Sequence, residues 1–157
     1  MKIKSISRST MSLMLAASAF MIATPASAQM QVFEDYEPSD AIYEMVTVNI
    51  EPGEFETYLE NLKQTWVQGN EIAKRLGHIE DYAIYANPNG AGDALDMVLM
   101  IKYSSTADLA PSKERYQAFM REWGKQREES SRKTVREVYN NIRELTGQYQ
   151  LRKIILK

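Results

Sequence analysis

The sequence predicts an α+β domain whose elements follow the order β-α-β-β-α-β. Strand-like segments with alternating side chains begin and end the domain, a turn-rich hairpin lies in its middle, and two long amphipathic segments separate them. This order is that of the ferredoxin-like fold, in which two helices cover one face of a four-stranded antiparallel sheet. We therefore expect residues 41–157 to form a single domain of this type.

The first half of the domain contains a strand and a helix. Over 41–50, one set of side chains alternates with another, a period of two that predicts a strand: the first set is Ile42, Val46, Val48 and Ile50, and the second is Tyr43, Met45, Thr47 and Asn49. Over 54–76, apolar residues recur at steps of three and four, which predicts a helix that lies on the sheet. Gly77 is expected to end this helix in a left-handed cap.

The second half contains a hairpin, a helical stretch and a last strand. Segments 78–86 and 97–103 predict strands, and the loop 87–93 between them is rich in the Asn, Pro and Gly residues of hairpin turns. A long helical stretch then runs to Leu145, with a bend or break expected in the polar segment 124–134. Gly147 is expected to end it, and 149–156 to form the last strand.

The N-terminus predicts a signal peptide over residues 1–28. Lys2, Lys4 and Arg8 precede a mostly apolar run, 11–23, and the small residues before Gln29 fit a cleavage site after Ala28. The apolar run is shorter than the roughly 20 residues that a permanent membrane anchor needs. We therefore expect a periplasmic or secreted protein, with no membrane attachment after cleavage and a flexible acidic lead segment over 29–40.

Charge and composition exclude several classes of function. The chain has 19 basic and 21 acidic residues, and the predicted signal removes only basic ones, so the exported domain is acidic and unsuited to nucleic acid. It has no cysteine, which excludes disulfides, thiolate catalysis and cysteine metal sites. The Asn and Asp residues of 87–96 do not have the spacing of a calcium loop, so we expect no metal and no cofactor.

Three segments carry a resemblance to a known superfamily. These are EMVTVNIEPGEFETYLENLKQTW at 44–66, Gly77-His78-Ile79 with Tyr82 and Tyr85, and SRKTVREVYNNIREL at 131–145. They resemble exported members of the dimeric α+β barrel superfamily, which includes antibiotic-biosynthesis-type monooxygenases and NIPSNAP-like proteins. The resemblance implies a homodimer in which the bare faces of two sheets close on each other. In the monooxygenases, this space holds a flat aromatic substrate that reacts with oxygen without a cofactor.

The strand pattern also favours a homodimer. Helices on one side leave the other sheet face bare, yet both faces of the strands carry large apolar groups, such as Tyr43 and Met45 opposite Ile42 and Val46. A second apolar face left in water would be an unusually large exposed patch. A twofold partner is its simplest cover.

Six residues are candidates for a ligand site between the sheets: Tyr43, Met45, Asn49, Trp66, His78 and Tyr82. His78, Tyr82 and Asn49 are also the candidates for acid-base or positioning roles, since His78 is the only side chain whose ordinary pKa lies near neutrality. Each also has a structural explanation: Trp66 lies on a helical apolar stripe typical of core, and His78 follows a helix-ending glycine.

The sequence thus leads to three hypotheses of function. We expect an exported domain that binds a small apolar or aromatic molecule between the sheets of a homodimer. A cofactor-independent monooxygenase-like enzyme is the first alternative. A structural or protein-interaction module, with the acidic lead segment as its contact, is the second.

Overall fold

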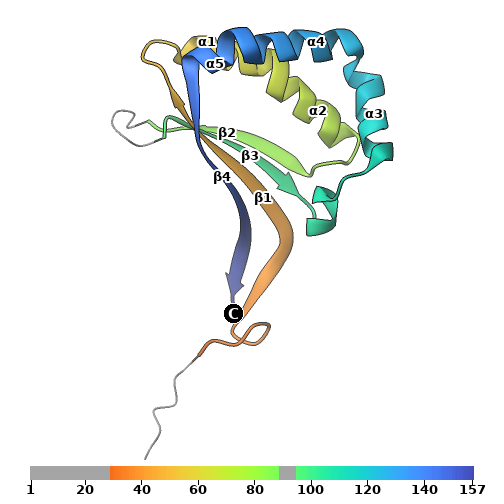
Figure 1. Ribbon diagram of the computed structural model, residues 1–157. Helices are drawn as coiled ribbons and strands as arrows, with labels where there is room; N and C mark the ends of the chain where they lie inside the picture. The colour runs from red at the N-terminus through yellow and green to blue at the C-terminus, as the bar shows by residue number, and fades with distance from the viewer. Residues whose placement is uncertain (1–28, 89–94) are drawn as a thin grey trace, which may run out of the picture.

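The computed structural model describes residues 29–88 and 95–157. The fold is α+β and ferredoxin-like, as predicted: its strands form one antiparallel sheet in the order β2-β3-β1-β4, and the helices lie on one face of it (Figure 1). The elements are β1 (Tyr36–Ile50), α1 (Phe55–Leu62), η1 (Lys63–Val67), α2 (Gln68–Arg75), β2 (Asp81–Ala86), β3 (Met97–Tyr103), η2 (Thr106–Leu109), α3 (Lys113–Trp123), α4 (Lys125–Thr134), η3 (Val135–Tyr139), α5 (Asn140–Ile142) and β4 (Arg143–Leu156).

The core lies between the helices and one face of the sheet. Val48 of β1 and Met97 of β3 are paired across the sheet and are both fully buried. Tyr58 and Leu62 of α1 and Tyr139 of η3 pack in the same cluster. The alternation predicted for the first strand is therefore confirmed, because its aliphatic set faces the helices.

The first helical segment, 55–75, ends where the sequence predicts. Gly77 has a φ of 69°, the left-handed region that glycine adopts without steric cost. The His78 N–H donates to the Ala73 carbonyl at 2.8 Å, and the Gly77 N–H donates to the Lys74 carbonyl at 3.0 Å. These two bonds form a Schellman cap, which satisfies the last carbonyls of the helix.

The second helical stretch breaks at Gly124, inside the segment where a bend or break is predicted. Gly124 has φ 80° and ψ 149°, so the chain leaves the helical conformation for one residue between α3 and α4. The indole N–H of Trp123 donates across this break to Glu128 Oε2 at 3.1 Å. The break therefore separates two helices that remain linked by side chains.

The predicted end of this stretch is wrong. The helix ends at Ile142, and β4 begins at Arg143, so Leu145 and Gly147 lie in the strand rather than in the helix and its stop. β4 pairs with β1 along its whole length, and Gly147 lies opposite Thr47, beside a register shift. Pairing with a strand about one hundred residues away decides the conformation here, whereas the sequence shows only local apolar spacing.

The first strand also differs from its prediction, because it begins at Tyr36 rather than at residue 41. The second part of the expected flexible lead segment is therefore strand, and Tyr36, Glu37 and Pro38 pair with the end of β4. The side chain of Lys157 ties the two strands together, with its Nζ 3.7 Å from Glu37 Oε2.

The signal peptide predicted over 1–28 lies outside the described residues, as do residues 89–93 of the predicted hairpin loop. The hairpin itself is confirmed, because β2 and β3 are consecutive antiparallel partners. Within 29–88 and 95–157, no helix combines the length and apolar character needed to cross a membrane.

Candidate functional site

The sheet face turned away from the helices is the candidate site, and we call it the open face. Paired residues of antiparallel strands share a face. Since Val46 and Val48 face the helices, their neighbours on β1 and the partners of those neighbours lie on the other side. The open face comprises Tyr43, Met45, Thr47 and Asn49 of β1, Asp81, Ala83 and Tyr85 of β2, Val98, Met100 and Lys102 of β3, and Tyr149 and Leu151 of β4.

In the middle of strand β4, the apolar side chains point to the open face. Gln148 and Gln150, which pair with residues of β1 that face the helices, are polar and exposed; nearer the start of the strand, apolar Leu145 also lies on the helix side. The alternate residues, Tyr149 and Leu151, are apolar and point to the open face, where they are 47% and 43% exposed. This is the reverse of the pattern expected for a single copy, in which the side without helices would be the polar one.

A depression lies on the open face over β2 and β3. Its volume is about 80 Å³, and it is lined by Tyr43, Asp81, Tyr82, Ala83, Tyr85, Met100 and Lys102. Pockets that enclose a small molecule usually have about 300–1,000 Å³. The depression alone is therefore only one wall of a site.

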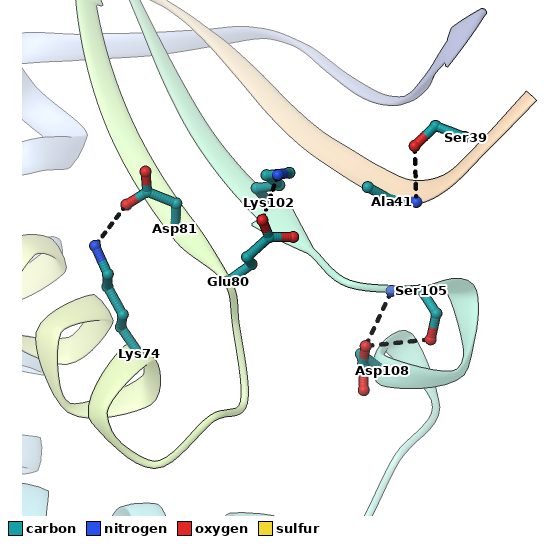
Figure 2. Close-up of polar contacts among 8 residues, drawn as sticks. All are labelled: Ser39, Ala41, Lys74, Glu80, Asp81, Lys102, Ser105 and Asp108. Atoms are coloured by element: carbon teal, nitrogen blue, oxygen red, sulfur yellow. Dashed lines mark hydrogen bonds and ion pairs between the residues drawn. The ribbon is translucent and has the colours of Figure 1, made fainter. Parts of the chain in front are cut away.

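The charged groups beside the depression are neutralised by neighbours. Lys74 reaches from α2 to Asp81, with 2.8 Å between Nζ and Oδ1, and Lys102 contacts Glu80 (Figure 2). The hydrogen bond from Lys74 is the largest cause that lowers the pKa of Asp81, and the one to Glu80 raises the pKa of Lys102. Each ion pair is formed within the chain, so Asp81 and Lys102 both have a partner of opposite charge.

The structure places Tyr43 and Met45 on the open face, as the ligand hypothesis requires. Asn49 lies on the same face at the end of β1, opposite Glu144. Its side-chain oxygen is buried and has no hydrogen-bond partner among the residues that the structure describes.

Trp66 and the Tyr82 ring are packed together on the helix side. Their rings meet edge to face with centroids 5.3 Å apart, so Trp66 belongs to the packing of helix on sheet. The Tyr82 hydroxyl donates to Glu71. Burial, then this hydrogen bond, raises the pKa of Tyr82 to about 12, so the phenol keeps its proton at neutral pH.

His78 lies elsewhere, in a shallow recess at the other end of the β2–β3 hairpin. The recess has a volume of about 240 Å³ and includes Tyr103, Asp108 and Arg115. Burial, followed by the positive charge of Arg115, lowers the pKa of His78, so its imidazole is neutral at pH 7. Asn49 lies beyond the opposite end of the hairpin, near Ala86. Counted along β2 at ~3.3 Å per residue, Asn49 is about 20 Å from the His78 end.

The six candidate residues are thus not brought together. Tyr43, Met45 and Asn49 share the open face, Trp66 and the Tyr82 ring lie under the helices, and His78 stands apart. The sequence-based candidates omit Ala83, Tyr85, Met100 and Lys102, which line the depression, and Tyr149 and Leu151, which border it along the sheet. Alternation on β3 and β4 is the signal for these residues, but using it requires knowing which face the helices cover.

A buried polar cluster inside the core is a second feature that the sequence did not reveal. The Tyr139 and Thr65 hydroxyls are 2.6 Å apart, and they join η3 to η1. The Arg143 guanidinium lies 4.5 Å from the centre of the Tyr139 ring and donates to the Tyr58 hydroxyl. Tyr58 and Tyr139 are almost completely buried, so this cluster holds the helices on the sheet rather than offering a surface to a ligand.

Metal ligands are not gathered anywhere in the described part of the chain, where no group of three or more His, Cys, Asp or Glu side chains is placed to hold an ion. The open face offers aromatic, thioether and aliphatic contacts, with Thr47 and Asn49 as uncharged polar groups.

No family model matches the sequence, and no curated protein matches it. Among solved structures, the chain is similar to a Shewanella oneidensis protein, with 13% identity and a TM-score of 0.48 over 77% of this chain and 99% of that one. It is also similar to a NIPSNAP family protein of unknown function from Agrobacterium tumefaciens, with 18% identity and a TM-score of 0.47 over 78% and 95%. A dimeric protein of unknown function with a ferredoxin-like fold from Bacteroides fragilis has 10% identity and a TM-score of 0.39 over 77% and 100%.

Proposed function

We propose that this domain is exported and binds a small apolar or aromatic molecule between the open faces of a homodimer. The observation that carries the proposal is the alternation on β4, where Tyr149 and Leu151 point to the side without helices and Gln148 and Gln150 to the side with them. The proposal of export depends on the order of charge, apolar run and small residues in 1–28.

The size of the depression also supports a site shared by two copies. One copy supplies an apolar wall with Tyr43, Ala83 and Met100, but its volume of about 80 Å³ leaves a ligand mostly in water. A second wall of the same composition, related by a twofold axis, would enclose a molecule between aromatic and thioether side chains. Asp81 and Lys102 beside this wall are paired within the chain, so the site does not require a charged ligand.

The enzyme alternative has less support from the geometry. An acid-base group acts within hydrogen-bond reach of the proton that it moves. His78 and Asn49 are at opposite ends of the hairpin, and the Tyr82 hydroxyl is held by Glu71. We therefore expect His78→Ala to leave ligand binding unchanged. A variant that binds the ligand but no longer converts it would favour the enzyme instead.

Native mass spectrometry of the protein recovered from an exporting host tests the proposal directly. We expect a dimer of chains that begin at Gln29 and carry additional bound mass, which also identifies the ligand by weight. Bare monomers would contradict both the dimer and the shared site, and would leave the interaction module as the hypothesis to pursue.

A matched pair of variants then tests whether the open face is the dimer interface. Leu151→Lys places a charge on the open face, and Gln150→Lys places the same charge one residue away on the other side of the exposed strand. We expect Leu151→Lys to raise the dimer dissociation constant at least tenfold, about 1.4 kcal/mol, because a buried unpaired charge is costly. Gln150→Lys should leave it unchanged. Equal effects of the two variants, measured by analytical ultracentrifugation, would show that the open face is not the interface.

A further inference from the structure

The β1–β4 pair extends well beyond the rest of the sheet. The last pair between β1 and β3 is Ile42 with Tyr103, whereas β1 and β4 stay paired to Tyr36 and Leu156. Figure 1 shows the two strands continuing away from the helices as a separate two-stranded projection. We call residues 30–41 and 153–157 the arm.

The arm bends out of the sheet and is fixed at its tip. The register of β1 and β4 shifts between Pro38 and Ile42, and such irregularities bend a strand and increase its twist. At the tip, the Lys157 N–H donates to the Asp35 carbonyl at 3.0 Å, and Lys157 Nζ donates to the Phe33 carbonyl at 2.6 Å. The arm is therefore a defined structural element rather than a frayed end.

The arm exposes several large apolar side chains among its charged ones. Leu156 is 70% exposed, and Phe33, Ile154 and Ile155 are also exposed. A two-stranded ribbon is marginally stable in water on its own, and exposed apolar strands associate with other chains. These side chains need a cover that the described part of one copy does not provide.

The arm and the open face together offer the area of a stable interface. Ile154 and Leu156 point to the side of β4 opposite Tyr149 and Leu151. The other exposed large apolar residues are Met30, Val32, Phe33, Tyr85, Tyr149, Leu151 and Ile155. At about 100 Å² each, roughly half the area of a large side chain, these amount to on the order of 700 Å². A standard interface buries about 800 Å² per partner, and the largest apolar patch on a monomer is about 300–600 Å².

The length of the arm fits the width of the sheet. The paired part of the arm, measured from Arg152 to Leu156 of β4, extends about 13 Å at ~3.3 Å per residue, and the outer strands of a four-stranded sheet are about 14 Å apart. When two open faces close on each other, an arm of this length reaches about from one edge of the other sheet to the opposite edge.

We propose that each arm lies across the open face of the second copy and forms the missing wall of the depression over β2 and β3. This inference rests on the proposed homodimer and names the part of the partner that completes its site. The partner's Ile155, which points to the same side of β4 as Tyr149 and Leu151, then faces Ala83, Tyr85 and Met100, so that an apolar molecule is enclosed between side chains of both copies.

Site-directed crosslinking tests this contact, because the chain has no cysteine and accepts a single labelled thiol. Ile155→Cys carries a benzophenone maleimide, and chains of natural and heavy isotopic composition are mixed before illumination. We expect crosslinks from the arm to residues 81–86 or 97–103 of the isotopically different chain. Gln150→Cys, exposed on the opposite side of the same strand, is the control and should give no such crosslink.

The outcomes separate this inference from the proposed function. A dimer that crosslinks to β2 or β3 supports both. A dimer whose Ile155 adducts fall on the helices, or only within the same chain, overturns the arm contact and leaves the homodimer standing. A monomer in sedimentation overturns both.

A second variant tests the contribution of the arm to the site. Ile155→Lys should raise the dimer dissociation constant about tenfold or more, and should weaken binding of the uncharged apolar probe Nile red to the remaining dimer by a similar factor. Unchanged dimer affinity and unchanged probe binding, with an unchanged melting temperature, would also overturn the inference.

Discussion

At the scale of single residues, Tyr103 links the stability of the fold to alkaline pH. Its hydroxyl donates to Glu44 Oε2 at 3.1 Å. Burial, followed by the charge of Glu44 and this hydrogen bond, raises the pKa of Tyr103 from 10.0 to about 12. The unfolded chain therefore loses this proton first, so the stability that Tyr103 contributes is complete below pH 10 and is lost as pH rises to about 12.

We expect the urea midpoint of the wild-type protein to fall steeply across this alkaline range, and that of Tyr103→Phe to fall less steeply. Glu44→Gln should have an intermediate slope, because it removes the charge and keeps the burial. The pKa of Tyr82 is also raised to about 12, so Tyr82 still contributes to the alkaline fall of the urea midpoint in Tyr103→Phe. Parallel curves for wild type and Tyr103→Phe would show that this hydroxyl is not coupled to folding.

At the scale of elements, two glycines of the first helical segment have opposite roles. Gly69 lies inside α2, where an added Cβ would be 3.8 Å from the Phe119 ring, an ordinary contact. Gly77 has a φ of 69° in the cap, which a side chain disfavours. Gly69→Ala should therefore increase the free energy of unfolding by about 0.5–1 kcal/mol, through helix propensity and contact with α3. Gly77→Ala should decrease it by about 1–2 kcal/mol.

Urea denaturation of both variants beside the wild type measures this difference, and circular dichroism checks that the helix content is kept. A destabilising Gly69→Ala would mean that α2 and α3 are packed more closely than the 3.8 Å contact indicates.

The same elements show which parts of the fold can be predicted from sequence. The alternation in 41–50 and the stop at Gly77 are local signals, and both predictions are confirmed. The early start of β4 depends on pairing with β1, and this long-range partner overrides the helical spacing around Leu145. Candidate site residues divide in the same way: Tyr43 and Met45 follow from alternation, but the position of His78 depends on where the hairpin joins the helices.

At the scale of the whole molecule, the helices cover only one side of the sheet (Figure 1). The core and the buried polar cluster lie between the helices and the sheet. Apolar residues of β1, β3 and β4 lie on the other side. In the proposed homodimer, association is part of folding, because the open face gains its cover only when two copies meet. The second half of the acidic lead segment belongs to the same arrangement, because it forms one strand of the arm.

If association and folding are coupled in this way, the melting temperature depends on protein concentration. A hundredfold increase in concentration stabilises a dimer by about 2.7 kcal/mol, which for two chains of this size corresponds to roughly 5–10 °C. We expect this shift in the wild type and in Gln150→Lys. Leu151→Lys should melt at a lower temperature than the wild type at every concentration, because its dimer is at least tenfold weaker. Calorimetry over this range distinguishes the cases: a wild type that melts at a constant temperature would mean that one copy is stable with its apolar face in water, and the ligand would then have to be sought on the helix side of the sheet.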